Sequence, residues 1–184
     1  VMEILGNSRE IILSFWEKAP YPLHQMLSIT LLYAHEVQAW IDCGEEAEFL
    51  PDVLLDRAEE LALPGDTEAI LAFFRELDIL TSRWEARLST ASPAPWSEKT
   101  KYFVRYALLR YYLQAVSDYD LICRVKWIVI ACLLLKTLGG DFVETAQLFS
   151  KEIENSTDNM EALFDGAYTS PAFTDCALLG LLNE

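Results

Sequence analysis

Residues 121–140 read LICRVKWIVIACLLLKTLGG and contain the longest apolar run of the chain. Its centre, residues 127–135, is an unbroken apolar run of nine residues between two lysines. A membrane-spanning helix needs about 20 such residues, so the run is too short to cross a bilayer. A helix that is apolar on every side predicts a position at the centre of a protein core. An aspartate before the run, Asp118 or Asp120, can cap the helix, and the glycine pair at 139–140 can end it.

Apolar residues recur at helical spacing along most of the remaining chain. They predict an all-α, bundle-like domain of about seven or eight helices. The two helices that flank the turn at 117–119 are expected to form a central antiparallel pair, because so short a connection joins neighbouring helices. The expected helices cover residues 7–18, 22–41, 51–61, 67–88, 97–116, 120–138, 141–153 and 156–164, with a short helical piece after Pro171.

The segment STASPAPW, residues 89–96, is the one clear break in this pattern, since its two prolines cannot continue a helix. It predicts a linker between an N-terminal helical subdomain, 1–88, and a C-terminal helical subdomain, 97–184. The charge also changes here: the first 92 residues hold 17 acidic and 6 basic residues, and the rest hold 12 and 8. We expect the two parts to pack as one compact unit.

The composition excludes several classes of protein. The chain has 184 residues, and its 52% of apolar residues exclude intrinsic disorder. Its net charge of −15 argues against nucleic-acid binding, which needs a surplus of Lys and Arg. His24 and His35 lie about 16 Å apart along one expected helix and cannot share a metal ion. We therefore expect no metal ion and, because the chain has no glycine-rich phosphate loop, no cofactor in this chain. The cysteines form no C-x-x-C pair and predict free thiols in a reducing compartment; they are Cys43, Cys123, Cys132 and Cys176.

Residues 97–136 form a basic stretch, with seven basic and three acidic residues in an otherwise acidic chain. The spacing of the apolar residues predicts that this part of the chain contributes an inner stripe to the core, with Arg105 and Arg110 on either side of it. Two interpretations stay open. The bases form a structural network, for which Asp120 and Arg124 are a ready i, i+4 pair, or they bind an anionic ligand or an acidic partner. The expected inner stripe is Tyr102, Tyr106, Leu109, Leu113 and Val116.

Two longer stretches, residues 102–140 and 148–165, resemble the C-terminal half of the flagellin lysine-N-methylase family. That family has an aromatic helix leading into D-x-D-L-x-x-R-V-K, and a later S-x-E-I-E-H-S element. The element at 21–42 is also similar to a helix of the family. Gln114 and Asn155 depart from the pattern, where Lys and His are expected. The matching positions are Arg110, Tyr111, Tyr112, Leu113, Ala115, Val116, Asp118, Asp120, Leu121, Arg124, Val125, Lys126, Phe149, Ser150, Glu152, Ile153, Glu154, Ser156 and Asn159.

The resemblance implies S-adenosylmethionine-dependent methylation of lysines on flagellin, in the cytoplasm before export. The family's N-terminal cysteine cluster, C-x-x-x-C-x-x-C-C, which implies an iron–sulfur or other metal centre, has no counterpart here. The start at Val1, before Met2, favours a segment of a longer protein that carries the cluster upstream. We expect this segment alone to be inactive.

Two hypotheses follow. The first is the helical C-terminal region of a flagellin lysine-N-methylase-like protein, which contacts substrate or cofactor through six candidate residues. The second is a non-catalytic helical protein-interaction module. Arg124 itself has two possible roles: a brace for the turn at 117–119, or an anchor for a ligand carboxylate. In either role, Glu152 is the distant acid expected to meet it. The oligomeric state stays open. The candidate contact residues are Arg110, Asp118, Asp120, Arg124, Lys126 and Glu152.

Overall fold

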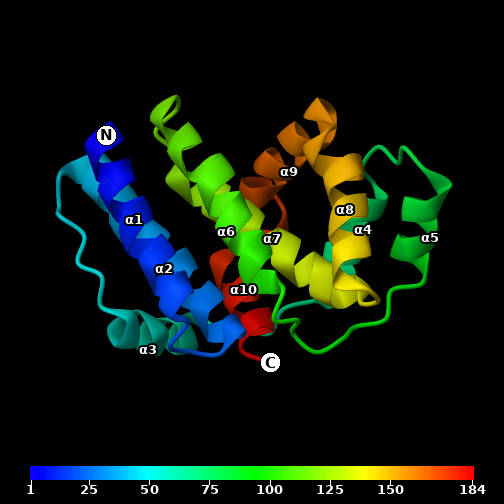
Figure 1. Cartoon of the computed structure of the whole chain (residues 1–184), viewed down its shortest axis with the longest axis horizontal. Coiled ribbons are helices and arrows are strands. Elements are labelled where there is room, and N and C mark those ends of the chain that lie inside the picture. The colour runs from blue at the N-terminus through cyan, green and yellow to red at the C-terminus, as the bar shows by residue number, and fades with distance from the viewer.

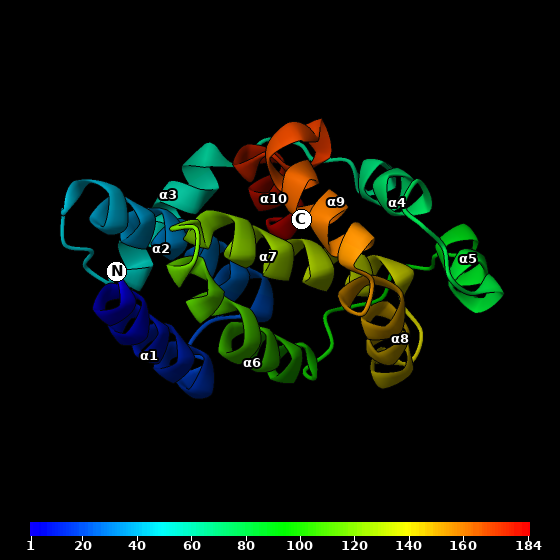
Figure 2. The same cartoon turned by 90° about the horizontal axis from the view of Figure 1, so that it is seen from above.

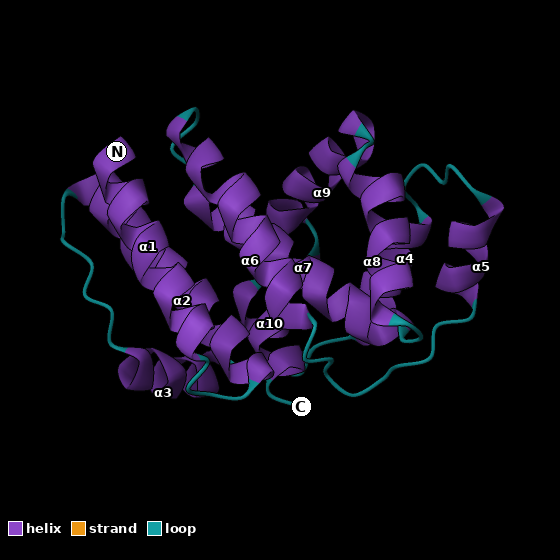
Figure 3. Cartoon of the chain, in the orientation of Figure 1, coloured by secondary structure: helices purple, strands orange, loops and turns teal.

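The structure, a computed structural model, describes all 184 residues. It is entirely helical, with ten α-helices, two 3-10 turns and one π-helical turn, and no strand (Figure 3). The all-α prediction is confirmed, whereas the expected number of helices is too low. The elements are α1 Met2–Lys18, α2 Leu23–Cys43, α3 Pro51–Leu61, α4 Thr67–Arg75, α5 Ser82–Ser89, α6 Thr100–Tyr111, η1 Tyr112–Val116, α7 Leu121–Leu138, α8 Phe142–Phe149, η2 Ser150–Glu154, α9 Thr157–Thr169, η3 Pro171–Phe173 and α10 Asp175–Leu182.

The helices form three layers, seen edge-on in Figure 2. α2 and α7 contact each other along the middle layer. α1, α6 and α8 cover one side of this pair, and α3, α4, α9 and α10 lie on the other side (Figures 1 and 2). No helix combines the length and the apolar character needed to cross a membrane.

α7 is the central helix that its sequence predicts. All of its residues except Ile122 and Lys136 are buried, and Leu134 is completely inaccessible. Full burial of a leucine or isoleucine side chain stabilises a fold by about 1.5–3 kcal/mol, so α7 contributes a large share of the hydrophobic stabilisation. One connected apolar cluster reaches from Leu5 to Leu182 and draws on both sides of residues 89–96.

The helix expected over residues 67–88 is in fact two helices, and this prediction is wrong. α4 ends at Arg75 and α5 begins at Ser82, although apolar residues continue at helical spacing through the break. The backbone N–H of Asp78 donates to the side chain of Asn159 at 3.0 Å, and that of Leu80 donates to Glu152 at 2.8 Å. These distant side chains replace the hydrogen bonds that a continuous helix would have made.

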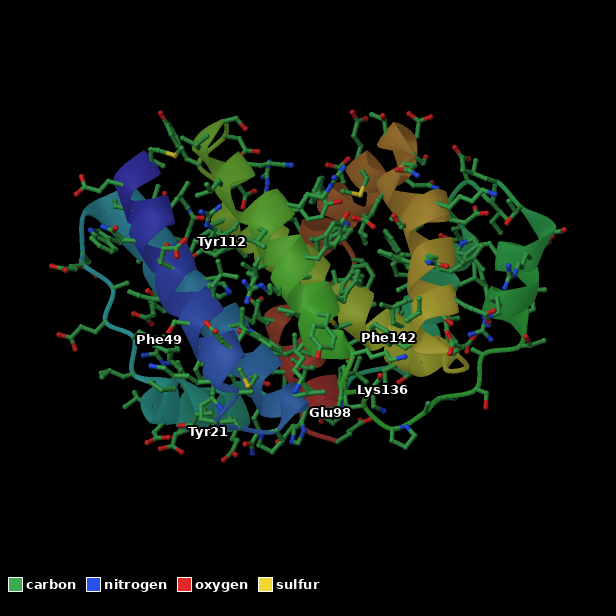
Figure 4. The ribbon with its side chains drawn as sticks, viewed as in Figure 1. Tyr21, Phe49, Glu98, Tyr112, Lys136 and Phe142 are labelled. Carbon is green, nitrogen blue, oxygen red and sulfur yellow. The ribbon has the colours of Figure 1, made fainter.

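The inner stripe expected between residues 97 and 116 is also placed wrongly. Tyr102 is 68% exposed, and Tyr106 and Leu109 are exposed as well. α6 instead buries its opposite face, which holds Ala107, and η1 buries Ala115. These small side chains allow close packing of the segment against its neighbours. The tyrosine of η1 labelled in Figure 4, Tyr112, donates from its hydroxyl to Ser8 of α1 at 2.9 Å.

Candidate functional site

Arg124 ties together the turn between η1 and α7. Its Nη1 lies 2.7 Å from Oδ2 of Asp118 and donates to the backbone oxygen of Asp120 at 3.1 Å. Its guanidinium lies over the ring of Phe164 of α9, 5.3 Å from the ring centre. Arg124 is 9% exposed, and its Nε is buried without a hydrogen-bond partner. The ionic partner is therefore Asp118, whereas the i, i+4 spacing predicted the carboxylate of Asp120.

The carboxylate of Asp120 is occupied by other contacts. Its Oδ1 accepts the backbone N–H of Cys123 at 3.0 Å and so caps α7. The same oxygen accepts the hydroxyl of Tyr168 in α9 at 2.6 Å. Burial and the Asp120 carboxylate raise the pKa of Tyr168, and burial raises the pKa of Cys123 to about 12. Neither group is ionised near neutral pH, so the thiol at this corner is not an activated nucleophile.

Lys126 lies two residues after Arg124 in α7 and is 5% exposed. Its Nζ donates to the backbone oxygen of Ala167 at 2.5 Å and lies 3.8 Å from Oδ1 of Asp175. Burial lowers the pKa of Lys126, against the pull of Asp175. Burial would raise the pKa of Asp175, but His35, at 3.1 Å, and Lys126 outweigh it and the pKa is lowered. Lys126 thus links α7 to α9 and α10.

Glu152 does not meet Arg124, and that prediction is wrong. Its fully buried carboxylate accepts the N–H of Leu80 and the hydroxyl of Thr81 at the break between α4 and α5. The reason is helix length. α7 has 18 residues and is about 27 Å long, whereas α8 has eight residues and is about 12 Å long, so α8 and the short η2 turn are too short to bring Glu152 back to the start of α7.

Arg110 belongs to a second cluster, at the C-terminal end of α6. Its Nε lies 3.2 Å from the hydroxyl oxygen of Tyr111. The hydroxyls of Tyr111 and Tyr106 both donate to Oε1 of Glu154 in η2, the latter at 3.0 Å. Burial and the Glu154 carboxylate raise the pKa of both tyrosines. Arg110 and Arg105 form no ion pair with any carboxylate of the chain.

Glu154 also lines a groove of about 400 Å³ between α6 and α8. Lys99 lies at the start of its α6 wall, and Glu154 follows the end of its α8 wall. Figure 4 shows Phe142 on the side of α8 that is turned toward α6. The π-turn at 150–154 continues α8 and places Glu154 at the groove; such turns often mark functional sites. The remaining lining residues are Tyr102, Phe103, Tyr106, Val143, Ala146, Gln147 and Ser150.

Of the six candidate residues, the structure brings Asp118, Asp120 and Arg124 together, with Lys126 beside them. Arg110 and Glu152 lie elsewhere. The groove was missed because the sequence signals for it, Tyr102 and Tyr106, fit a buried stripe equally well. Nothing local reveals that α8 stands opposite them.

The cysteines do not fit a metal centre. All four are free, Cys43 is exposed, and Cys123 and Cys132 are buried. No group of three or more His, Cys, Asp or Glu side chains is arranged to hold a metal ion. No step is therefore assigned through the metal centre that the resemblance implies.

Comparison with protein-family models, with curated proteins and with solved structures found no match to the chain.

Proposed function

We propose that this chain is a protein-binding helical domain, and that the groove between α6 and α8 receives a segment of the partner. The single observation that carries the proposal is this groove of about 400 Å³, lined by aromatic residues that stay exposed. Tyr102 is 68% exposed and Tyr106 is 41% exposed. Aromatic residues at a concave site are the common anchors of protein interfaces, because they bury much area at little entropic cost.

The resemblance to flagellin lysine-N-methylases gives this proposal a candidate partner. In that role the chain is the helical C-terminal region of such a protein and contacts a lysine of flagellin. The aliphatic stem of a lysine fits against Tyr102 and Phe142, and its ammonium group reaches the carboxylate of Glu154. Methyl transfer from S-adenosylmethionine would be carried out with parts of the protein outside this chain.

The second candidate is a non-catalytic interaction module that uses the same groove. The observation in its favour is that the corner residues are engaged in holding the fold. Arg124 binds Asp118, and Asp120 caps α7. Arg124 is then a brace and not a ligand anchor.

Calorimetric titration of the chain with monomeric flagellin tests these proposals. We expect Tyr102→Ala to weaken binding about tenfold or more, as loss of an aromatic anchor does. Tyr119→Ala is the matched control, because Tyr119 is 57% exposed but does not line the groove.

Glu154→Gln separates the two candidates. If a lysine of flagellin binds in the groove, Glu154→Gln should weaken the binding of flagellin. Flagellin with acetylated lysines should then bind the wild-type chain equally weakly, since acetylation removes the positive charge. If Tyr102→Ala weakens binding and Glu154→Gln does not, the interaction module is supported. If flagellin does not bind the wild-type chain, the flagellin proposal is wrong.

A further inference from the structure

The outer face of α6 and η1 is apolar and basic, and nothing in the chain covers it. Leu109 is 49% exposed and Val116 is 39% exposed. Arg105 and Arg110 flank this row without a carboxylate partner, and no acidic residue occurs between residues 98 and 118. Arginines without an ion pair, beside an exposed leucine and an exposed valine in a chain of net charge −15, favour an acidic, amphipathic partner.

The chain itself carries such a surface on α3. Residues 45–60 hold seven acidic residues and one basic residue. The basic residue, Arg57, is already paired with Glu36. On α3 and beside it, Leu50, Val53 and Leu61 are 40–52% exposed. Asp56 and Glu60, one helical turn apart, are exposed and form no ion pair.

These two faces lie on opposite sides of the molecule. In Figure 2, α6 lies in one outer layer, and α3 lies across the middle layer on the other side. Two α6 faces repel each other because both are basic, and two α3 faces repel because both are acidic. Only contact of α6 on one copy with α3 on the next brings opposite charges together.

We propose that copies of this chain associate head to tail, with the outer face of α6 and η1 on one copy bound to the outer face of α3 on the next. The contact goes beyond the proposed groove, since it uses Arg105, Leu109 and Arg110 and none of the α8 wall. Leucines and valines of the two helices bury one another, and the arginines face Asp56 and Glu60. Because the two surfaces differ, the contact is heterologous and adds further copies without closing as a dimer.

Sedimentation velocity across a concentration series tests the proposal. At about 0.1 M salt, charges more than about 10 Å apart are largely screened, so the net charge of each copy opposes contact only weakly. We expect the average mass of the wild type to rise with concentration past that of a dimer. Reversal of the basic face, Arg105→Glu with Arg110→Glu, should weaken association about tenfold or more, because attractive pairs become repulsive ones. Reversal of the acidic face, Asp56→Lys with Glu60→Lys, should weaken it equally.

An equimolar mixture of the two reversed variants is the decisive sample. Each variant alone has two faces of like charge, but in the mixture each face meets one of opposite charge, so association should return. Damage to the fold would not be rescued by mixing. The conservative pair Arg105→Lys with Arg110→Lys keeps the charges and should associate like the wild type.

Three results would overturn the proposal. The first is that the wild type stays monomeric up to a concentration on the order of 1 mM. If that monomer nevertheless binds a peptide of residues 48–63, the α6 face is a site for an acidic helix of another protein, and self-association is wrong. The second is a mass that stops at the dimer and ignores reversal of α3. The third is a mixture that fails to associate. Flagellin binding through the groove is a separate measurement, unaffected by changes on α3, so the two proposals fail independently.

Discussion

Replacement of Glu152 by alanine tests the structural origin of the break between α4 and α5. The Glu152 side chain is fully buried and accepts hydrogen bonds from the N–H of Leu80 and the hydroxyl of Thr81. A hydrogen bond to a charged group contributes about 1.5–3 kcal/mol, so two of them give about 3–6 kcal/mol. Both donors lie in a half-buried segment where water can replace part of this, and we expect Glu152→Ala to cost about 3 kcal/mol of unfolding free energy.

Urea denaturation of Glu152→Ala and Glu154→Ala gives the comparison. Glu154 lies in the same π-turn and also accepts two hydrogen bonds, both from tyrosine hydroxyls, but it is partly exposed. Its replacement should cost less, about 1 kcal/mol, because Glu154 itself is partly exposed and water can take the place of its carboxylate at the two tyrosine hydroxyls. Hydrogen exchange of the Leu80 amide should also accelerate in Glu152→Ala only. Equal costs for the two variants, or unchanged exchange at Leu80, would refute the assignment.

Three further predictions concern the corner and the core. Arg124→Lys should lower the unfolding free energy by about 1–3 kcal/mol, because it weakens the ion pair to Asp118 and the hydrogen bond to the Asp120 backbone. The exposed control Arg105→Lys should change the unfolding free energy little, and an unchanged midpoint in Arg124→Lys would show that Arg124 is no brace. Leu134→Ala should cost about 2–5 kcal/mol in the same assay, and a loss below about 0.5 kcal/mol would mean that α7 is not the centre of the core. The pKa of Asp175 is below its usual value in the folded state. The stabilising effect of this carboxylate should therefore be complete above about pH 4 and be lost as the pH falls through the folded-state pKa. In Asp175→Asn, the unfolding midpoint should lack this part of its dependence on acid.

The sequence predicts what depends on neighbouring residues. The burial of residues 127–135 follows from an apolar run too dense for a surface helix, and Leu134 confirms it. The corner at Asp118 and Arg124 forms because these residues flank one helix start. Which aspartate pairs with Arg124 depends on Tyr168, which is distant in sequence and engages Asp120.

Features that depend on distant residues could not be predicted in this way. The break between α4 and α5 exists because Asn159 and Glu152 bind the backbone there, and no spacing within residues 67–88 reveals them. The groove needs α6 and α8, which are separated in the sequence by α7 and lie opposite each other only in the tertiary structure. The exposed face of α6 is decided by side-chain volume at Ala107 and not by the spacing of apolar residues.

α6 and η1 carry apolar side chains on two opposite faces, so an early helix over residues 100–116 can dock in two orientations related by about half a turn. Docking through Leu109 and Leu113 buries apolar area quickly but holds the helix away from α7, because the native face relies on Ala107 and Ala115 for close approach. We expect refolding to include a misdocked intermediate that must separate before the native pairing forms, a slow kinetic phase that owes nothing to proline or disulfide chemistry.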